Sequence, residues 1–156
     1  MKVGRINRMH SLCACLLCVM TFGLSSCVDD NDDWWNPPQG YDYIDNRLTG
    51  YWALVQYNSE NVSAADANYM YFNGNGYGTY YYLENGYNER ESLRYWCQNS
   101  NTGASNFQIN IQYQYGGAST MSYWFTHGDN TLWMQWRTSG GRVQTYVYDR
   151  VYRAPW

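Results

Sequence analysis

The chain has 156 residues, of which 19% are aromatic and 15% are charged, and its formal net charge is −3. This length corresponds to one domain. Ten Lys and Arg against thirteen Asp and Glu provide no basic face for phosphate groups, so the composition argues against a nucleic-acid partner. It argues equally against an anionic polymer as ligand.

The first 26 residues have the composition of an export leader. Three basic residues, Lys2, Arg5 and Arg8, precede an apolar stretch over residues 11–24. This stretch is shorter than the roughly 20 residues that span a bilayer as a helix. The motif Leu24-Ser25-Ser26-Cys27 then resembles the lipobox of bacterial lipoproteins. The resemblance implies a signal peptide over residues 1–26 and a Cys27 that carries lipid, including palmitate. The alternative is an ordinary secretory leader followed by a chance cysteine.

An acidic cluster follows the cysteine and consists of Asp29, Asp30, Asp32 and Asp33. Such dense like charge keeps a segment extended and solvated. The cluster resembles the export signal of surface lipoproteins of Bacteroidota. That resemblance implies a lipid anchor in the outer membrane, with the protein on the cell surface. A charged spacer on a periplasm-facing lipoprotein is the alternative. Residues 27–47 are therefore predicted to be the lipidated cysteine and an acidic tether, whose end packs as a short turn on the domain.

Residues 48–156 are predicted to form one all-β domain. Short apolar runs alternate with Asn- and Gly-rich turns, as in an antiparallel meander. Eight strands are expected, over residues 51–58, 68–73, 76–83, 92–98, 106–115, 120–127, 131–137 and 142–153. A helical turn is expected at 63–67. Eight such strands can close into an up-and-down β-barrel, which leaves no exposed sheet edge.

Period-2 alternation assigns one face of each strand to the interior. The expected inward residues include Trp52, Leu54, Met70, Phe72, Phe107, Ile109, Ile111, Tyr113, Met121, Tyr123, Phe125, Leu132, Met134 and Trp136. For the last strand the apolar choice is Val143, Thr145 and Val147. This choice places Gln144 and Tyr146 outside. Only Cys97 remains as a cysteine besides Cys27 once the leader is removed, so no internal disulfide is expected.

Several motifs together resemble the lipocalin-like domain of small Bacteroidota-type surface lipoproteins. In chain order they are Leu48-Thr49-Gly50-Tyr51-Trp52, Phe72-Asn73-Gly74-Asn75-Gly76-Tyr77-Gly78, Tyr95-Trp96, Asn130-Thr131-Leu132 and Tyr148-Asp149-Arg150-Val151. The Gly-x-Trp element is shared with lipocalins proper. The resemblance implies that Trp52 closes one end of the barrel and that Arg150 packs over its ring, with Arg153 as the second choice.

Two functions from different classes follow. In the first, the barrel binds a small lipophilic or glycan ligand. The expected ligand-binding residues are Trp96, Phe107, Ile109, Tyr123, Phe125, Met134 and Trp136. In the second, the barrel is solid, and the protein is a non-catalytic structural or accessory subunit of a surface assembly. A cavity above about 300 Å³ lined by the inward residues would favour the ligand.

An enzyme is not expected. His127, the one histidine outside the leader, lies in a turn, and Cys97 has the character of a small buried side chain. Glu89 and Glu91 flank Arg90 in a polar segment rather than facing each other across a cleft. No metal or cofactor is predicted, since one His and one Cys do not make a tetrahedral site. A transmembrane barrel is disfavoured because most of the expected strands are shorter than about 9–11 residues.

Overall fold

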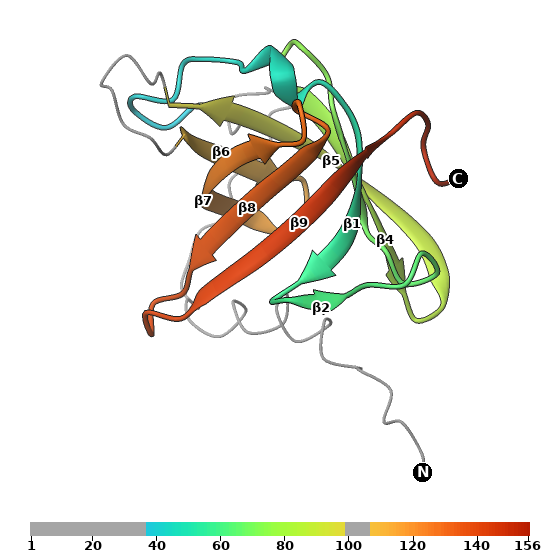
Figure 1. Ribbon diagram of the computed structural model, residues 1–156. Coiled ribbons are helices and arrows are strands. Elements are labelled where there is room, and N and C mark those ends of the chain that lie inside the picture. Colours follow the sequence, from blue (N-terminus) through green and yellow to red (C-terminus); the bar gives the residue numbers. More distant parts are fainter. Residues whose placement is uncertain (1–36, 99–106) are drawn as a thin grey trace, which may run out of the picture. The chain divides into compact units, whose positions relative to one another are not determined.

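The computed structural model describes residues 37–98 and 107–156 (Figure 1). The lipobox, Cys27 and the acidic cluster therefore lie outside the described residues. The described part contains a 3-10 helix, η2 (Asn46–Leu48), and nine strands. The strands are β1 (Gly50–Tyr57), β2 (Glu60–Asn61), β3 (Tyr69–Phe72), β4 (Tyr77–Glu84), β5 (Tyr87–Cys97), β6 (Phe107–Tyr113), β7 (Gly117–Thr126), β8 (Thr131–Arg137) and β9 (Val143–Val151).

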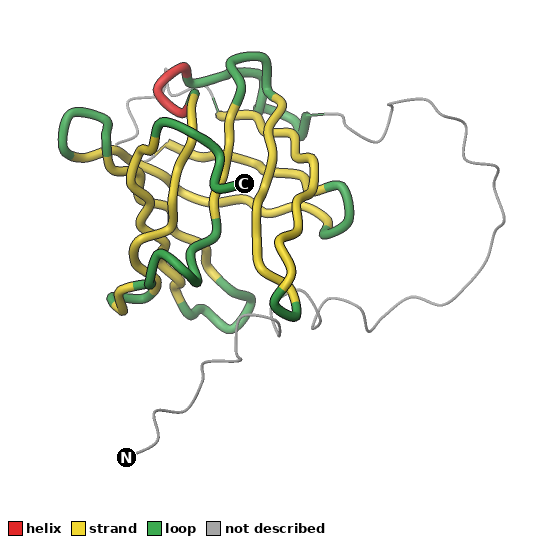
Figure 2. Tube along the Cα trace, turned by 90° about the vertical axis from the view of Figure 1, so that its right-hand side faces the viewer, coloured by secondary structure: helices red, strands yellow, loops and turns green. Residues whose placement is uncertain are grey.

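Eight of these strands form a closed antiparallel barrel. From β3 to β9 each strand pairs with its neighbour in chain order, and β1 pairs with both β3 and β9. The predicted all-β, eight-stranded, up-and-down barrel is confirmed. Figure 2 shows the strands from the side. β2 was not predicted: it pairs only with the end of β1, through Gln56 and Tyr57, and is an extra strand outside the ring.

The turns follow from residues that tolerate positive φ. Asn85 and Gly86 link β4 to β5 with φ of 52° and 84°. His127, Gly128 and Asp129 link β7 to β8 with φ of 54°, 64° and 63°. Gly and Asn or Asp populate this region at low cost, and His is enriched there among the other residues. The turns at 85–86, 114–116 and 138–142 lie at one end of the barrel, called here the hairpin end. η2 lies at the opposite end, called the η2 end (Figure 1).

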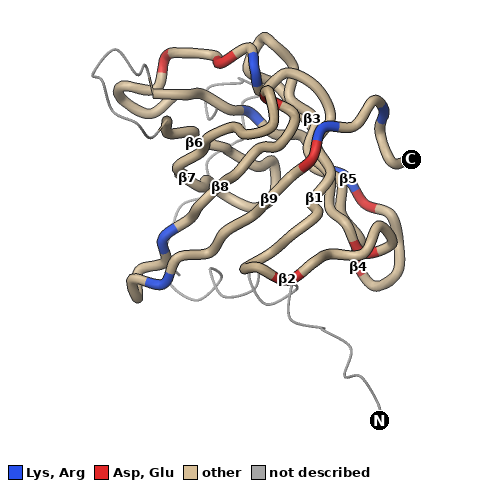
Figure 3. The backbone as a smooth tube through the Cα atoms, in the orientation of Figure 1, with Lys and Arg blue, Asp and Glu red and all other residues tan. Residues whose placement is uncertain are grey.

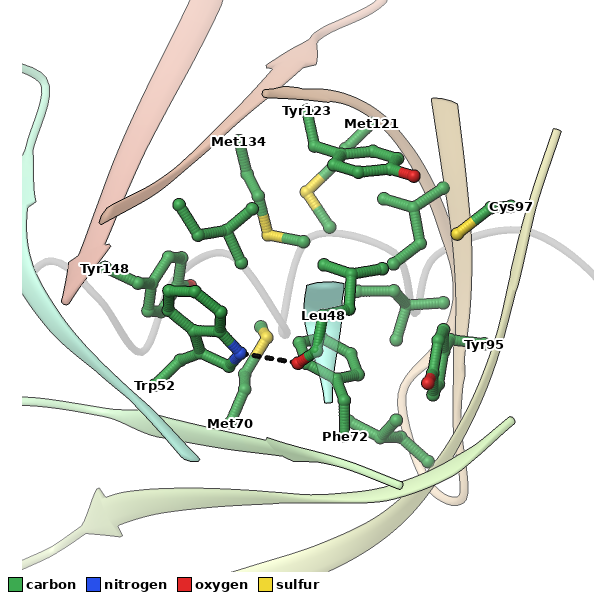
Figure 4. Packing of buried hydrophobic residues seen from close by; sticks show 14 of the residues in the cluster. Leu48, Trp52, Met70, Phe72, Tyr95, Cys97, Met121, Tyr123, Met134 and Tyr148 are labelled. Carbon is green, nitrogen blue, oxygen red and sulfur yellow. Dashed lines mark hydrogen bonds between the residues drawn. The ribbon is translucent and has the colours of Figure 1, made fainter. Parts of the chain in front are cut away.

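The barrel interior is filled by side chains from every strand of the ring (Figure 4). The largest side chains that are less than 2% exposed are Trp52, Tyr95, Tyr123 and Phe72. They interleave with Leu, Ile and Met side chains, as close packing of a core requires. Phe72 and Tyr95 meet edge to face at 4.8 Å between ring centroids. The described core therefore runs from η2 through the middle of the barrel.

Two predicted orientations are wrong. On β9, Tyr146 and Tyr148 pack in the core, whereas Val143 is 43% exposed. Their partners confirm the face, because Tyr148 pairs with Leu132 and Leu54, and both of these are buried inside. On β5, Tyr95 and Cys97 point inward, so the intervening Trp96 lies on the outer face. In both strands aromatic residues occupy both faces, and apolar character alone does not distinguish them.

The middle of the sheet is unusually poor in charge. β6 and β7 carry no charged residue, and β8 carries only Arg137 at its last position. Figure 3 shows charged residues mostly near strand ends and in connections, apart from those within β5. Trp124 and Trp133 stack on the outer face of β7 and β8 with centroids 5.7 Å apart and planes 12° apart. This outer face therefore carries no charge except Arg137 at the hairpin end and is partly aromatic.

Candidate functional site

The η2 end is closed by a tryptophan and an arginine. Trp52 is fully buried, and its indole Nε1 donates to the carbonyl of Leu48 at 2.7 Å (Figure 4). The Arg150 guanidinium lies 4.3 Å above the Trp52 ring, within the range of a cation–π contact. It also donates to the carbonyls of Thr49 and Arg47, each at 2.7 Å, and to Asp129 at 3.1 Å. This is the contact that the lipocalin resemblance implied. Arg153, the second choice, is exposed.

Backbone conformation and lack of space explain why the Gly-x-Trp element begins with a glycine, Gly50. Gly50 has φ of 127°, a conformation that side chains rarely adopt. A Cβ there would also lie 2.9 Å from Nη1 of Arg150. A side chain at this position would push Arg150 away from the carbonyl of Thr49. Gly50 and Trp52 at the start of β1 therefore depend on the same residue of β9, Arg150, and we call these three residues the closing unit.

Next to this unit, Arg47 of η2 occupies the space between two predicted ligand residues. The Arg47 guanidinium lies 4.8 Å from the Phe107 ring centroid and 4.7 Å from that of Phe125. It pairs with Asp45 at 2.6 Å, and the Tyr123 hydroxyl donates to the same carboxylate at 2.9 Å. Phe107, Tyr123 and Phe125 thus meet, but around the chain's own Arg47 and Asp45.

The pKa values in this group follow from burial and pairing. Burial raises the pKa of Asp45, but the hydrogen bonds from Arg47 and Tyr123, together with the charge of Arg47, outweigh it, so the pKa is lowered overall. Burial raises the pKa of Tyr123 and of the Cys97 thiol. Asp45 therefore stays ionised, whereas Cys97 and Tyr123 stay protonated. The ionised Asp45 and the protonated Tyr123 form the hydrogen bond that holds η2 on the barrel. A protonated thiol is not a reactive nucleophile.

The hairpin end has a different character. We define the tyrosine cluster as Tyr80, Tyr82, Tyr113, Tyr146 and Tyr148. Tyr80 stacks on Tyr82 at 5.3 Å and meets Tyr113 edge to face at 5.7 Å. Tyr148 is buried beneath them, and its pKa is raised by burial and by the neighbouring Tyr80, Tyr113 and Tyr146. Aromatic faces and hydroxyl groups thus converge from β4, β6 and β9.

Polar side chains bond to the cluster. The Asn68 amide donates to the Tyr80 hydroxyl at 2.8 Å, and the Tyr146 hydroxyl donates to Gln144 at 3.1 Å. Trp136, opposite Gln144 in the β8–β9 pairing, packs half-buried against the core. Apolar surface with a few fixed polar groups is typical of small-molecule sites. The tyrosine cluster, with Trp136 and Gln144, is the candidate ligand site.

The predicted ligand residues are not gathered in one pocket. Ile109 and Met134 are fully buried within the core. Trp136 reaches the candidate site, Trp96 lies outside the barrel, and the other three surround Arg47. A cavity of about 470 Å³ is present, but it lies against the outer side of the barrel wall. None of the predicted ligand residues lines it.

The described residues hold few groups suited to metal binding or to acid–base chemistry. Across 37–98 and 107–156, no group of three or more His, Cys, Asp or Glu side chains is placed to hold a metal ion. Within the same ranges no helix has the length and apolar character needed to cross a membrane. His127 is exposed at the β7–β8 turn, where its Nδ1 lies 3.2 Å from the Thr131 hydroxyl.

No protein-family model matches this chain, and no curated protein matches it with significant similarity.

The tyrosine cluster was largely missed from the sequence. Tyr80, Tyr81 and Tyr82 follow one another, and three tyrosines in a row give no apolar–polar contrast with which to assign faces. The strand register shows which of the three faces the core, because Tyr80 pairs with the buried Met70. The signal available in the sequence was the asparagine-glycine turn before β4, which fixes the phase of the strand once the pairing is known.

Proposed function

We propose that this chain is a lipid-anchored lipoprotein of the outer-membrane surface, with a lipocalin-like barrel that binds a small lipophilic or glycan ligand at the tyrosine cluster. The observation that carries the ligand site is the convergence of Tyr80, Tyr113 and Tyr146 on the buried Tyr148. The contact of Arg150 with Trp52 supports the lipocalin-like assignment. The lipobox and the acidic cluster support the location.

The position of the site constrains the ligand. Buried side chains fill the described interior, from Leu48 at the η2 end to Tyr148 beneath the tyrosine cluster. The ligand therefore sits at the hairpin end and not deep in the barrel. A ligand there meets tyrosine ring faces together with hydroxyl and amide groups. An amphipathic molecule of modest size satisfies both kinds of contact.

The location is tested by two sets of substitutions. Cys27→Ala should abolish metabolic labelling with palmitate and leave an unanchored precursor. Replacing Asp29, Asp30, Asp32 and Asp33 with Ala should retain the lipid but remove protease accessibility on intact cells. Labelling that persists in Cys27→Ala would remove the basis of the anchor, and unchanged accessibility would make the acidic cluster a mere spacer.

The ligand site is tested with an apolar fluorophore whose emission rises on burial. Wild-type protein should give a saturable titration, and Tyr146→Ala should weaken the apparent affinity at least about tenfold, the effect of losing about 1.4 kcal/mol. The matched control is Tyr77→Ala, because Tyr77 is 47% exposed on the outer face of β4. Equal effects of the two variants would refute the site. Competition by short glycans would favour the glycan over the lipophilic ligand.

A second function is favoured by the outer face of β6, β7 and β8, which carries no charge except Arg137. Interface cores are depleted in charge and enriched in tryptophan, as is the surface around Trp124 and Trp133. In this alternative the barrel is a non-catalytic accessory subunit that docks a surface partner protein. Ser122→Arg, on this face between Gln108 and Gln135, should then dissociate a native complex isolated in mild detergent. Thr138→Arg, in the β8–β9 turn, is the control.

A further inference from the structure

A groove on the outer side of the barrel has the features of a second binding site. It has a volume of about 470 Å³, within the range of about 300–1,000 Å³ of small-molecule sites. One wall is the segment 153–156 after β9, which lies along the outside of the barrel. The other walls are the turn at 64–67 and the β4–β5 hairpin, through Leu83 and Asn88. The groove shares no residue with the tyrosine cluster.

An aromatic side chain in this groove is held in place and partly exposed. Trp156 contacts the rings of Tyr69 and Tyr81 at 6.2 and 6.0 Å, with interplanar angles of 74° and 84°. Tyr81 is buried, whereas Trp156 retains 41% of its exposure. Two perpendicular aromatic contacts fix the indole without covering it fully. A fixed, partly exposed indole offers a stacking surface at low entropic cost.

Two polar side chains also line the groove. The side chains of Arg153 and Asn88 line the groove, and neither has a hydrogen-bond or ion-pair partner among residues 37–98 and 107–156. Both are exposed, so both are available to a ligand. Arg153 is the one charged residue among those lining the groove. A guanidinium without a partner prefers a carboxylate, which it can bind in bidentate fashion.

Four of the side chains that line the groove are small. Ala64, Ala65, Ala67 and Ala154 contribute no long groups that would fill it. A flat ring can therefore approach the indole closely. These groups suit a pyranose ring that carries one carboxylate. The indole can contact the C–H groups on one face of the ring, the amide can bond to a hydroxyl at its rim, and the guanidinium can bind the carboxylate.

We propose that this groove binds a uronic acid, a sugar ring that carries a single carboxylate. The ring stacks on Trp156, Arg153 binds the carboxylate, and Asn88 bonds to a ring hydroxyl. The proposal is independent of the ligand at the tyrosine cluster. It is also consistent with the net negative charge of the chain, since one fixed carboxylate on one arginine differs from a polyanion spread over an acidic surface.

The test is calorimetric titration of the purified full chain with glucuronic acid, and with glucose as the neutral partner. Glucuronic acid should bind saturably with a Kd of about 1 mM or weaker, as few-contact ligands do, and glucose at least about tenfold more weakly. Trp156→Ala and Arg153→Gln should each weaken glucuronic acid at least fivefold. Trp156→Phe, which keeps a ring, should retain most of the affinity.

The controls separate this site from the others. Tyr115→Ala removes an aromatic side chain that is 77% exposed in the β6–β7 turn, and Arg142→Gln removes an exposed arginine from the β8–β9 turn. Both should bind like the wild type. Tyr146→Ala should alter fluorophore binding but not glucuronic acid binding. The proposal is overturned if glucuronic acid shows no saturation up to about 50 mM, if glucose binds as well, or if the groove variants behave like the controls.

Discussion

Replacing Trp52 tests the η2 end most directly. The side chain is fully buried, its Nε1 donates to the Leu48 carbonyl at 2.7 Å, and the Arg150 guanidinium covers its ring at 4.3 Å. Large-to-small aromatic substitutions in cores cost about 3–5 kcal/mol. Since Trp52→Ala also leaves the Leu48 carbonyl unpaired and uncovers a guanidinium, we expect a loss of about 4–5 kcal/mol in the free energy of unfolding.

Graded substitutions separate the contributions to this loss. Trp52→Phe keeps an aromatic ring under Arg150 but removes the indole donor, so it should cost about 1–2 kcal/mol. Combining Trp52→Leu with Arg150→Met should show a coupling energy of about 0.5–2 kcal/mol in a double-mutant cycle. The assay is urea unfolding followed by far-ultraviolet circular dichroism. The control is Trp124→Ala, at a half-buried outer position, with an expected cost of about 1 kcal/mol.

The result that would contradict this reasoning is specific. A loss below about 1 kcal/mol for Trp52→Ala, with an unchanged denaturant slope, would mean that Trp52 is not a buried closing residue. A coupling energy of zero would mean that the guanidinium of Arg150 stabilises the η2 end only through the carbonyls of Thr49, Arg47 and Asp129. If Trp52→Ala does not fold, the Trp52→Phe variant and the cycle still decide the question.

Three further predictions concern the core and its charges. Because the pKa of Asp45 is lowered in the folded state, its carboxylate stabilises the fold above its unfolded pKa of about 3.9, and this stabilisation is lost as the pH falls through the folded value. Asp45→Asn should therefore flatten the pH dependence of the unfolding midpoint in acid. Cys97 is fully buried and its thiol pKa is raised, so in a leaderless Cys27→Ala chain an aromatic disulfide reagent should react only after urea unfolding. Gly78→Ala should cost about 1–3 kcal/mol in the same urea assay, because its Cβ would meet the Tyr71 carbonyl and the Leu93 side chain.

The strands could be predicted because each turn carries residues that permit positive φ, and because most strands show clear alternation. The face of β8 is an example: Leu132 and Met134 alternate with Trp133 and Gln135, and the first two are buried. The β9 face could not be predicted this way. Its outward valines are apolar and its inward Tyr146 and Tyr148 are amphipathic, so a hydropathy rule chooses the wrong set.

The candidate site was harder to predict than the fold, for a related reason. The interior position of Phe107, Tyr123 and Phe125 followed from alternation, but their neighbour Arg47 comes from η2. Local pattern cannot show that a charged residue of η2 will insert between two rings from β6 and β7. The predicted inward orientation of Trp96 was wrong for a different reason. Trp96 is one of two adjacent aromatic residues on β5, and only the pairing of Tyr95 with Ile111 shows which of the two is inside.

The tyrosines occupy two kinds of position in the barrel. A tyrosine in the middle of a core must find a partner for its hydroxyl, as Tyr123 does in Asp45 and Tyr95 does in the Asn73 carbonyl, at 2.9 and 2.6 Å. At the boundary of the core the same residue exposes its hydroxyl and keeps its ring buried. Tyr80, Tyr113 and Tyr146 occupy that boundary at the hairpin end. Rings packed on the core and hydroxyl groups at its edge are the combination that the proposed ligand site at the hairpin end requires.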